Sequence, residues 1–303
     1  MKKLILATND SSPRDPFITK HNGKYYRCFT NDCQGLYISC ADTIEGLTDA
    51  KAKKVFTPDK EEYSKELWAP ELHIIDGKCY IYVACDNGNN YNHRMYVLEN
   101  NSNDPMDEYV MHGQITDSTN KWAIDGNIVT YKGEMYYLWS GWEGERNVRQ
   151  SIYIAKLSDP YTISTERALI STPEYDWELI GSTPEDVEDA PYINEGPFGF
   201  VYNDTLYVAY SASGSWCTGY CIAFLKLVGE NPLNAKDWHK YDKPVLSCDG
   251  VVKGAGHPSI ILEEDKNHIF FHAWEEECQE IFWDRVCAWH AELVINGDEI
   301  IIK

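Results

Sequence analysis

The sequence has few basic residues and no long apolar run. Its 303 residues include 27 Lys and Arg against 48 Asp and Glu, giving a formal net charge of −21. Such a chain repels polyanions and lacks the basic patch that binds phosphate groups. No apolar run is long enough to span a bilayer. These absences argue against nucleic acid or a membrane as a partner and favour a neutral ligand.

The N-terminus lacks the features of an export signal. Residues 1–10 contain two lysines but only about four apolar residues before polar residues return, which is too short for the apolar region of a signal peptide. The sequence therefore predicts a cytoplasmic protein, either a monomer or a small homo-oligomer.

The ten cysteines include no Cys-x-x-Cys pair. The spacings of Cys28 with Cys33 and of Cys217 with Cys221 match zinc ligands weakly. Free cysteine packs as a small apolar residue in a reducing compartment. We expect buried thiols and neither a structural zinc nor an organic cofactor.

A sustained apolar stripe of helical period is also missing, whereas short aromatic strands recur five times. The turns that open them are 54, 56, 71 and 63 residues apart, and this repeat fills the chain. They begin Gly23-Lys-Tyr-Tyr, Gly77-Lys-Cys-Tyr, Gly133-Glu-Met-Tyr, Asp204-Thr-Leu-Tyr and Asn267-His-Ile-Phe. Repeats of this kind predict an all-β fold, a single five-bladed β-propeller that forms one catalytic domain over residues 1–303. A two-sheet sandwich is the alternative, but it gives no reason for five similar turns.

Three carboxylates occupy similar positions relative to these turns. Asp15 lies eight residues before Gly23, Asp125 eight before Gly133, and Glu195 nine before Asp204. The strand before the first hairpin of a propeller blade runs beside the central channel, so we expect the three side chains to converge at one mouth of it. Crowded carboxylates separate in pKa into an acid and a base, as glycoside hydrolysis requires. Loop capping, bonds to backbone amides or cation binding remain alternatives.

One motif before each aromatic strand resembles glycoside hydrolase family 43, and the similarity covers the whole chain. The motifs are Asp15-Pro16-Phe17, Trp68-Ala69-Pro70-Glu71, Ile124-Asp125-Gly126, Glu195-Gly196-Pro197 and Gly256-His257-Pro258-Ser259. Stretches that begin at Asn92, Trp139 and Tyr210 are more similar to the α-L-arabinofuranosidase branch than to the xylosidase branch.

The resemblance implies an inverting mechanism with a single displacement. Asp15 matches the general base that activates water, Glu195 the general acid, and Asp125 the residue that tunes and orients the acid. Inversion requires that the carboxyl groups of Asp15 and Glu195 stand roughly 6.5 to 9.5 Å apart, which leaves room for the attacking water.

Further residues are assigned to sugar binding. His257 matches a family histidine beneath the sugar, in some members beside a channel cation or water. A structural Ca²⁺ in the central channel near His257 is therefore an alternative to a site without metal, and a hydrogen-bonded core histidine is another. Arg285 falls where the family often sends an arginine to the sugar, and Trp68 and Trp216 offer flat faces for stacking. Surface exposure of Arg285 and packing roles for both tryptophans are the alternatives.

These observations predict an exo-acting α-L-arabinofuranosidase that acts on neutral arabino-oligosaccharides. A β-D-xylosidase on the same fold is the nearest alternative, since the two pentoses differ in ring size and hydroxyl geometry. A non-catalytic propeller that binds carbohydrate or protein is a second alternative, because a fold alone implies no function.

Overall fold

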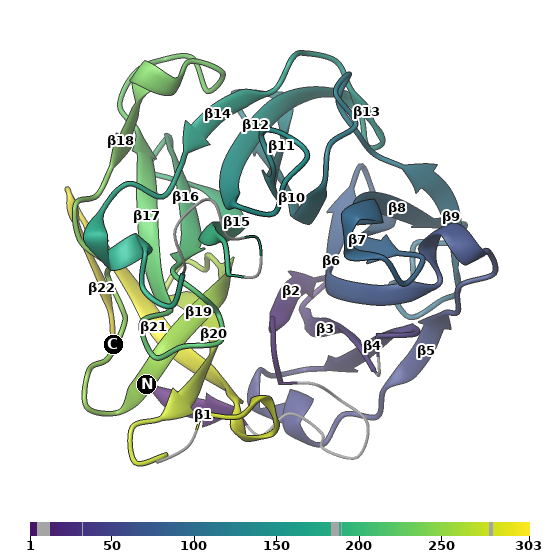
Figure 1. Ribbon diagram of the computed structural model, residues 1–303. Helices are drawn as coiled ribbons and strands as arrows, with labels where there is room; N and C mark the ends of the chain where they lie inside the picture. The colour runs from purple at the N-terminus through teal and green to yellow at the C-terminus, as the bar shows by residue number, and fades with distance from the viewer. Residues whose placement is uncertain (5–12, 32, 183–187, 189, 279–280) are drawn as a thin grey trace.

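The computed structural model describes residues 1–4, 13–31, 33–182, 188, 190–278 and 281–303. Their strands form antiparallel sheets arranged around a common centre (Figure 1). The helices in these parts of the chain are short 3₁₀ turns, and none is long and apolar enough to cross a membrane. Most of the N-terminal segment on which the predicted location depends lies outside the described residues. The predicted all-β class is confirmed.

The sheets follow the sequence repeat. The first contains β2 (Phe17–His21), β3 (Lys24–Thr30), β4 (Leu36–Ala41) and β5 (Lys53–Phe56), and the second β6 (Lys65–Ile75), β7 (Lys78–Asp86), β8 (Arg94–Asn100) and β9 (Tyr109–Gln114). A nine-stranded sheet follows, with β10 (Ala123–Tyr131), β11 (Glu134–Gly141), β12 (Arg149–Asp159), β13 (Thr162–Ile163), β14 (Ala168–Ser171), β15 (Tyr192–Tyr202), β16 (Thr205–Ala212), β17 (Cys221–Leu227) and β18 (Trp238–Lys240). The last sheet holds β19 (Val252–Ile261), β20 (Asn267–Glu275), β21 (Cys287–Asn296) and β22 (Glu299–Ile302).

The nine-stranded sheet divides into two units. Its halves meet through a short parallel pairing of β12 with β15, where Arg149 faces Tyr192 and Gln150 faces Ile193. All its other pairings are antiparallel. Division at this bridge gives five antiparallel units, the number that the sequence repeat predicts.

The N-terminal strand closes the ring. β1 (Lys2–Leu4) pairs with β21 of the last unit, while the first unit begins at β2. The two ends of the chain therefore contribute to the same sheet, and the first and last units are held together.

The core lies between the units. Five buried apolar clusters each combine strands of two neighbouring units, from the first and second to the fifth and first. Along β7, Ile81 and Val83 enter the cluster shared with the first unit, while Tyr80 and Tyr82 enter the one shared with the third. A strand alternates its side chains between two faces. Burial on both faces explains why the strands are rich in aromatic and β-branched residues.

Short 3₁₀ helices lie in the connections. They are η1 (Glu45–Thr48), η2 (Glu61–Tyr63), η3 (Asn90–Asn92), η4 (Asp176–Glu178), η5 (Ala235–Asp237) and η6 (Trp283–Arg285). All ten cysteines are free, but only Cys28, Cys79, Cys85 and Cys221 are buried. The expectation of buried thiols is wrong for the others. The most exposed, Cys248, lies in a connection after β18 rather than in a unit interface.

Candidate active site

Each unit carries the same backbone irregularity at its innermost strand. In each unit a residue at this strand combines a positive φ with a Pro or Gly directly after it. These residues are Asp15 (φ 49°), Ala69 (42°), Asp125 (56°), Gly196 (56°) and His257 (56°). In β6, β10, β15 and β19 the pairing register shifts at this point. Such a bulge redirects side chains and is common beside active sites, and here it aims the motif residues at the centre.

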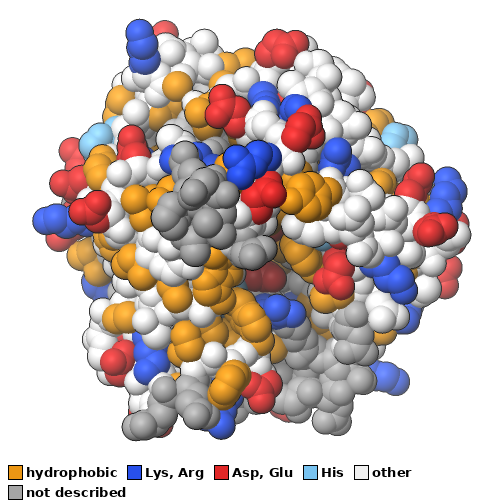
Figure 2. Space-filling model, in the orientation of Figure 1, with side chains coloured by type: hydrophobic (Ala, Val, Ile, Leu, Met, Phe, Trp, Pro, Cys, Tyr) orange, Lys and Arg blue, Asp and Glu red, His pale blue; other side chains and the backbone are white. Residues whose placement is uncertain are grey.

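The three predicted catalytic carboxylates line one pocket of about 320 Å³. Asp15 precedes β2, Asp125 lies on β10 and Glu195 on β15, so three units contribute. His257, Trp68 and Trp216 line the same pocket. Figure 2 shows this face hollowed near its centre. The structure therefore brings together the residues that the motif register selected.

Asp15 lies between two histidines. Its Oδ1 is 3.2 Å from Nδ1 of His257 and 3.3 Å from Nδ1 of His272, and its backbone N–H donates to His272 Nδ1 over 3.1 Å. Burial alone would raise the pKa of Asp15, but the charge of His257 and the contacts with His272 lower it well below its ordinary value. The Asp15 side chain stays 29% exposed. It is an ionised carboxylate within reach of water, as a general base must be.

Glu195 has the opposite environment. Burial, followed by the charge of Asp125, raises the pKa of Glu195 to about 8, although a hydrogen bond from Tyr220 opposes the shift. The Tyr220 hydroxyl donates to Oε1 of Glu195 over 2.8 Å. Glu195 is therefore protonated at neutral pH and can donate to a leaving oxygen.

Asp125 links the acid to its neighbouring unit. Its Oδ2 accepts a hydrogen bond of 2.9 Å from the backbone N–H of Gly196, directly after Glu195. Burial raises the pKa of Asp125 to about 6, with the charges of His257 and Asp15 acting in opposite directions. Because it holds the backbone beside the acid and adds negative charge, Asp125 can both orient Glu195 and raise its pKa.

Tyr220 was not predicted as a site residue from the sequence. It is one of 21 tyrosines and lies outside the five motifs. It packs against Gly256, where a Cβ would overlap the Tyr220 ring. The glycine before His257 was therefore the available signal that an aromatic ring approaches this motif.

His257 faces the carboxylates. Burial lowers its pKa, but the charges of Asp15, Asp125 and Glu195 outweigh burial and the net shift is upward. Its backbone N–H donates to Ser211 Oγ over 2.6 Å. Among the described residues, no group of three or more His, Cys, Asp or Glu side chains could hold a metal ion. A channel Ca²⁺ near His257 therefore stays one of the two alternatives that the sequence left open, and these acidic, histidine and cysteine side chains supply no ligand group for it.

The residues assigned to sugar binding differ in position. Trp68 stacks on His93 with ring centroids 4.1 Å apart, and Trp216 is 40% exposed. Arg285 does not line the pocket. It is exposed on η6, with its guanidinium 5.8 Å from the Phe282 ring. Among the described residues, Arg14 lines the pocket and Arg285 does not, so a role for Arg285 at the sugar stays a prediction.

The pKa values predict how activity depends on pH. Because Glu195 must carry a proton, kcat/KM should fall as the pH rises through about 8. The pKa of Asp15 lies so low that its protonation should cause no fall near neutral pH. In Tyr220→Phe the bond that favours the ionised form of Glu195 is lost, so the alkaline limb should move to higher pH.

The measurement is the pH profile of kcat/KM, which reports pKa values of the free enzyme. Tyr207→Phe is the matched control, because the Tyr207 ring stacks on Phe200 and neither residue lines the pocket. An alkaline limb that stays in place or moves to lower pH in Tyr220→Phe would show that Glu195 is not the group that titrates.

The fold and the pocket define a class of enzyme. A pair of carboxyl groups, one ionised and one protonated, is the equipment of a glycoside hydrolase. Residues 9–297 match the family described as glycosyl hydrolases family 43. The chain belongs to this family, which confirms the resemblance drawn from its motifs and the predicted class of enzyme.

Relatives within the family support the predicted branch. An extracellular exo-α-(1→5)-L-arabinofuranosidase of Streptomyces chartreusis is 28% identical over 86% of this chain and 79% of its own length. An α-L-arabinofuranosidase 43 of Humicola insolens is 30% identical over 83% of this chain, which spans 52% of that protein. The crystal structure of an α-L-arabinofuranosidase from Lactobacillus brevis superimposes with a TM-score of 0.85 at 26% identity, covering 98% of this chain and 95% of that one. The chain thus spans about half the length of one of these relatives and most of the other two.

Proposed function

We propose that the protein is an exo-acting, inverting α-L-arabinofuranosidase that releases arabinose from neutral arabino-oligosaccharides. The observation that carries the proposal is the convergence of Asp15 and Glu195 on one pocket, in surroundings that shift their pKa values in opposite directions. The names of the similar proteins, two of which are α-L-arabinofuranosidases and one an exo-α-(1→5)-L-arabinofuranosidase, support the choice of sugar.

The chemistry is one displacement at the anomeric carbon. Glu195 gives its proton to the glycosidic oxygen as the bond from that oxygen to the anomeric carbon breaks. Asp15 takes a proton from a water molecule whose oxygen bonds to the same carbon from the opposite face. The products are a free pentose with inverted configuration and the shortened alcohol. A proton must then return from Asp15 to Glu195 through solvent before the next turnover.

Electrostatics favour this division of roles. His257 and His272 stabilise the negative charge of Asp15 before reaction, whereas burial and Asp125 keep Glu195 protonated. A site that only binds sugar has no use for two carboxyl groups held in opposite states. This argument separates the enzyme from a non-catalytic propeller.

A comparison of two substrates tests which sugar the enzyme releases. The purified protein is incubated with p-nitrophenyl α-L-arabinofuranoside and with p-nitrophenyl β-D-xylopyranoside, with Asp15→Ala as the inactive control. We expect nitrophenol from the arabinofuranoside alone, and none from the control. Preferential release from the xyloside would make the protein a β-D-xylosidase, and binding of oligosaccharide without any release would support a binding propeller.

The location and assembly of the protein stay predictions. A cytoplasmic enzyme would meet imported oligosaccharides, whereas the name of the Streptomyces chartreusis relative includes the word extracellular. The single catalytic domain over residues 1–303 also stays a prediction from the sequence. So does its presence as a monomer or small homo-oligomer.

A further inference from the structure

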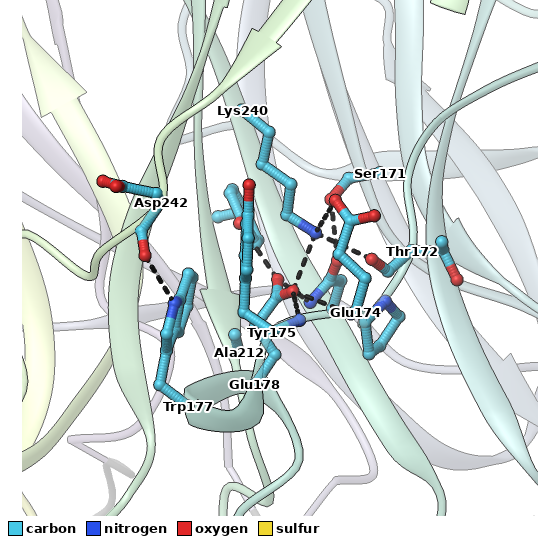
Figure 3. Close-up of polar contacts among 12 residues, drawn as sticks. Ser171, Thr172, Glu174, Tyr175, Trp177, Glu178, Ala212, Lys240 and Asp242 are labelled. Carbon is cyan, nitrogen blue, oxygen red and sulfur yellow. Dashed lines mark hydrogen bonds and ion pairs between the residues drawn. The ribbon is translucent and has the colours of Figure 1, made fainter.

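A buried carboxylate lies behind the general acid, outside the pocket. Glu178 ends η4 and is fully buried. Its Oε2 accepts hydrogen bonds from the backbone N–H groups of Glu174 and Tyr175 over 2.9 and 3.0 Å, and from Lys240 Nζ over 2.8 Å. Figure 3 shows Lys240 and Glu178 facing one another above the short helix. Burying a charge is costly unless it is paired and fully hydrogen-bonded. Glu178 meets this condition because Lys240 and two backbone N–H groups surround its Oε2.

The other oxygen of Glu178 leads to the catalytic strand. Its Oε1 accepts from Asn194 Nδ2 over 2.9 Å and from the Tyr210 hydroxyl over 3.1 Å. Asn194 is fully buried and directly precedes Glu195. Side chains of adjacent strand residues point to opposite faces, so Asn194 is anchored between units while Glu195 enters the pocket.

Asn194 makes further hydrogen bonds. Its Oδ1 accepts from Ser171 Oγ over 2.7 Å, and its backbone carbonyl accepts from Ser140 Oγ over 2.9 Å. Ser140 and Ser171 belong to the third unit, whereas Asn194 belongs to the fourth. Asp125, which binds the N–H of Gly196, also belongs to the third unit. The residues on both sides of Glu195 are therefore fixed to the neighbouring unit.

The same segment holds part of the pocket rim. Beyond Glu178, the N–H of Ile180 donates to Ser213 Oγ over 3.1 Å, and that hydroxyl donates to the carbonyl of Trp177 over 2.7 Å. The indole N–H of Trp216 donates to the carbonyl of Gly181 over 2.9 Å. Movement of the segment after η4 would therefore move a pocket-lining ring.

We propose that Glu178 is a positioning residue for Glu195, which it fixes through Asn194, with Lys240 as the counter-charge that allows it to be buried. This inference rests on the proposed function, because it concerns the acid of that reaction. Glu178 does not line the pocket. It ties β18 and the segment after β14 to β15, the strand that carries the acid.

The test uses Glu178→Gln and two arabinofuranosides. A dinitrophenyl leaving group departs without a proton, whereas the sugar alcohol of an arabino-oligosaccharide needs one from Glu195. A small displacement of a catalytic group can cost up to about 100-fold. We expect the variant to lose about 10- to 100-fold in kcat on the oligosaccharide and less than about 3-fold on the dinitrophenyl substrate. Equal losses on both substrates would show a general structural role and overturn the proposal.

Two controls sharpen this result. Asp117→Asn removes another buried carboxylate paired with a cation, Arg167, at 3.4 Å, and should not separate the two substrates. In a Glu195→Ala background, Glu178→Gln should cause no further loss, because interacting sites are not additive. If Glu178→Gln lowers kcat in the Glu195→Ala background as much as it does in the wild-type protein, the proposal is contradicted. If Glu178→Gln does not fold, Asn194→Ala breaks the same connection and is expected to give the same separation.

Failure of the positioning role of Glu178 can be distinguished from failure of the proposed arabinofuranosidase activity. A wild-type protein that cleaves neither arabinofuranoside contradicts that function. The carboxyl resonance of Glu195, followed by ¹³C NMR and assigned with Glu195→Ala, then gives an independent measure of the surroundings of that carboxyl group. Its titration should shift in Glu178→Gln and not in Asp117→Asn. An unshifted titration in both would overturn the positioning role.

Discussion

Replacing Glu195 with alanine is expected to lower turnover of an arabino-oligosaccharide by about 10²- to 10⁴-fold, the usual contribution of a general acid. The reason is the protonation state that burial and Asp125 impose on Glu195. Without that proton, the departing sugar alcohol must leave as an alkoxide. A dinitrophenyl arabinofuranoside, whose leaving group needs no proton, should lose far less. The measurement is kcat/KM on both substrates for wild type and variant.

A surface glutamate provides the control for this experiment. Glu299→Gln changes an exposed residue of β22, at the rim of the last unit, and should leave both rates unchanged. The assignment of Glu195 as the acid fails if Glu195→Ala retains oligosaccharide turnover. It also fails if kcat/KM of the variant falls equally on both substrates, because the effect of removing a general acid must depend on how much the leaving group needs a proton.

Replacing Asp15 with asparagine should give a loss of about 10²- to 10⁴-fold that does not depend on the leaving group. Asp15 prepares the attacking water, which every substrate requires. Asparagine keeps the shape of the side chain but cannot take a proton from water. The variant should also lose the ion pair with His257, so the comparison includes a check of folding by circular dichroism.

The sequence offers a matched control for Asp15. Asp104 also precedes a proline, but it is exposed and its Oδ1 accepts from the N–H of Met106 in a turn. Asp104→Asn should therefore retain full activity on every substrate. Retained activity in Asp15→Asn, or a loss confined to poor leaving groups, would remove Asp15 from the role of base.

The fold could be predicted because its signal is local and repeated. Turns such as Gly77 and Gly133 have the positive φ that glycine tolerates, and the strands after them alternate between two apolar interfaces. The register of Asp15 and Asp125 also followed from counting along one strand. Neither inference needed knowledge of which units touch.

Contacts between residues far apart in the sequence could not be predicted in this way. The bond from Gly196 to Asp125, the approach of Tyr220 to Glu195 and the link from Glu178 to Asn194 join residues 16 to 71 positions apart. They depend on how strands and connections pack in three dimensions, which no local pattern encodes. The sequence likewise did not indicate that Arg14 rather than Arg285 lines the pocket, because the direction of a connection such as η6 decides which side chains reach it.

The configuration of the first product tests the central claim most directly. Wild-type protein is mixed with an α-L-arabinofuranoside, and ¹H NMR records the anomeric proton before mutarotation equilibrates the sugar. If Asp15 directs water to the face opposite the leaving group protonated by Glu195, β-L-arabinofuranose should appear first. Initial formation of the α-anomer would mean retention through a covalent intermediate and would contradict the roles assigned to both carboxyl groups.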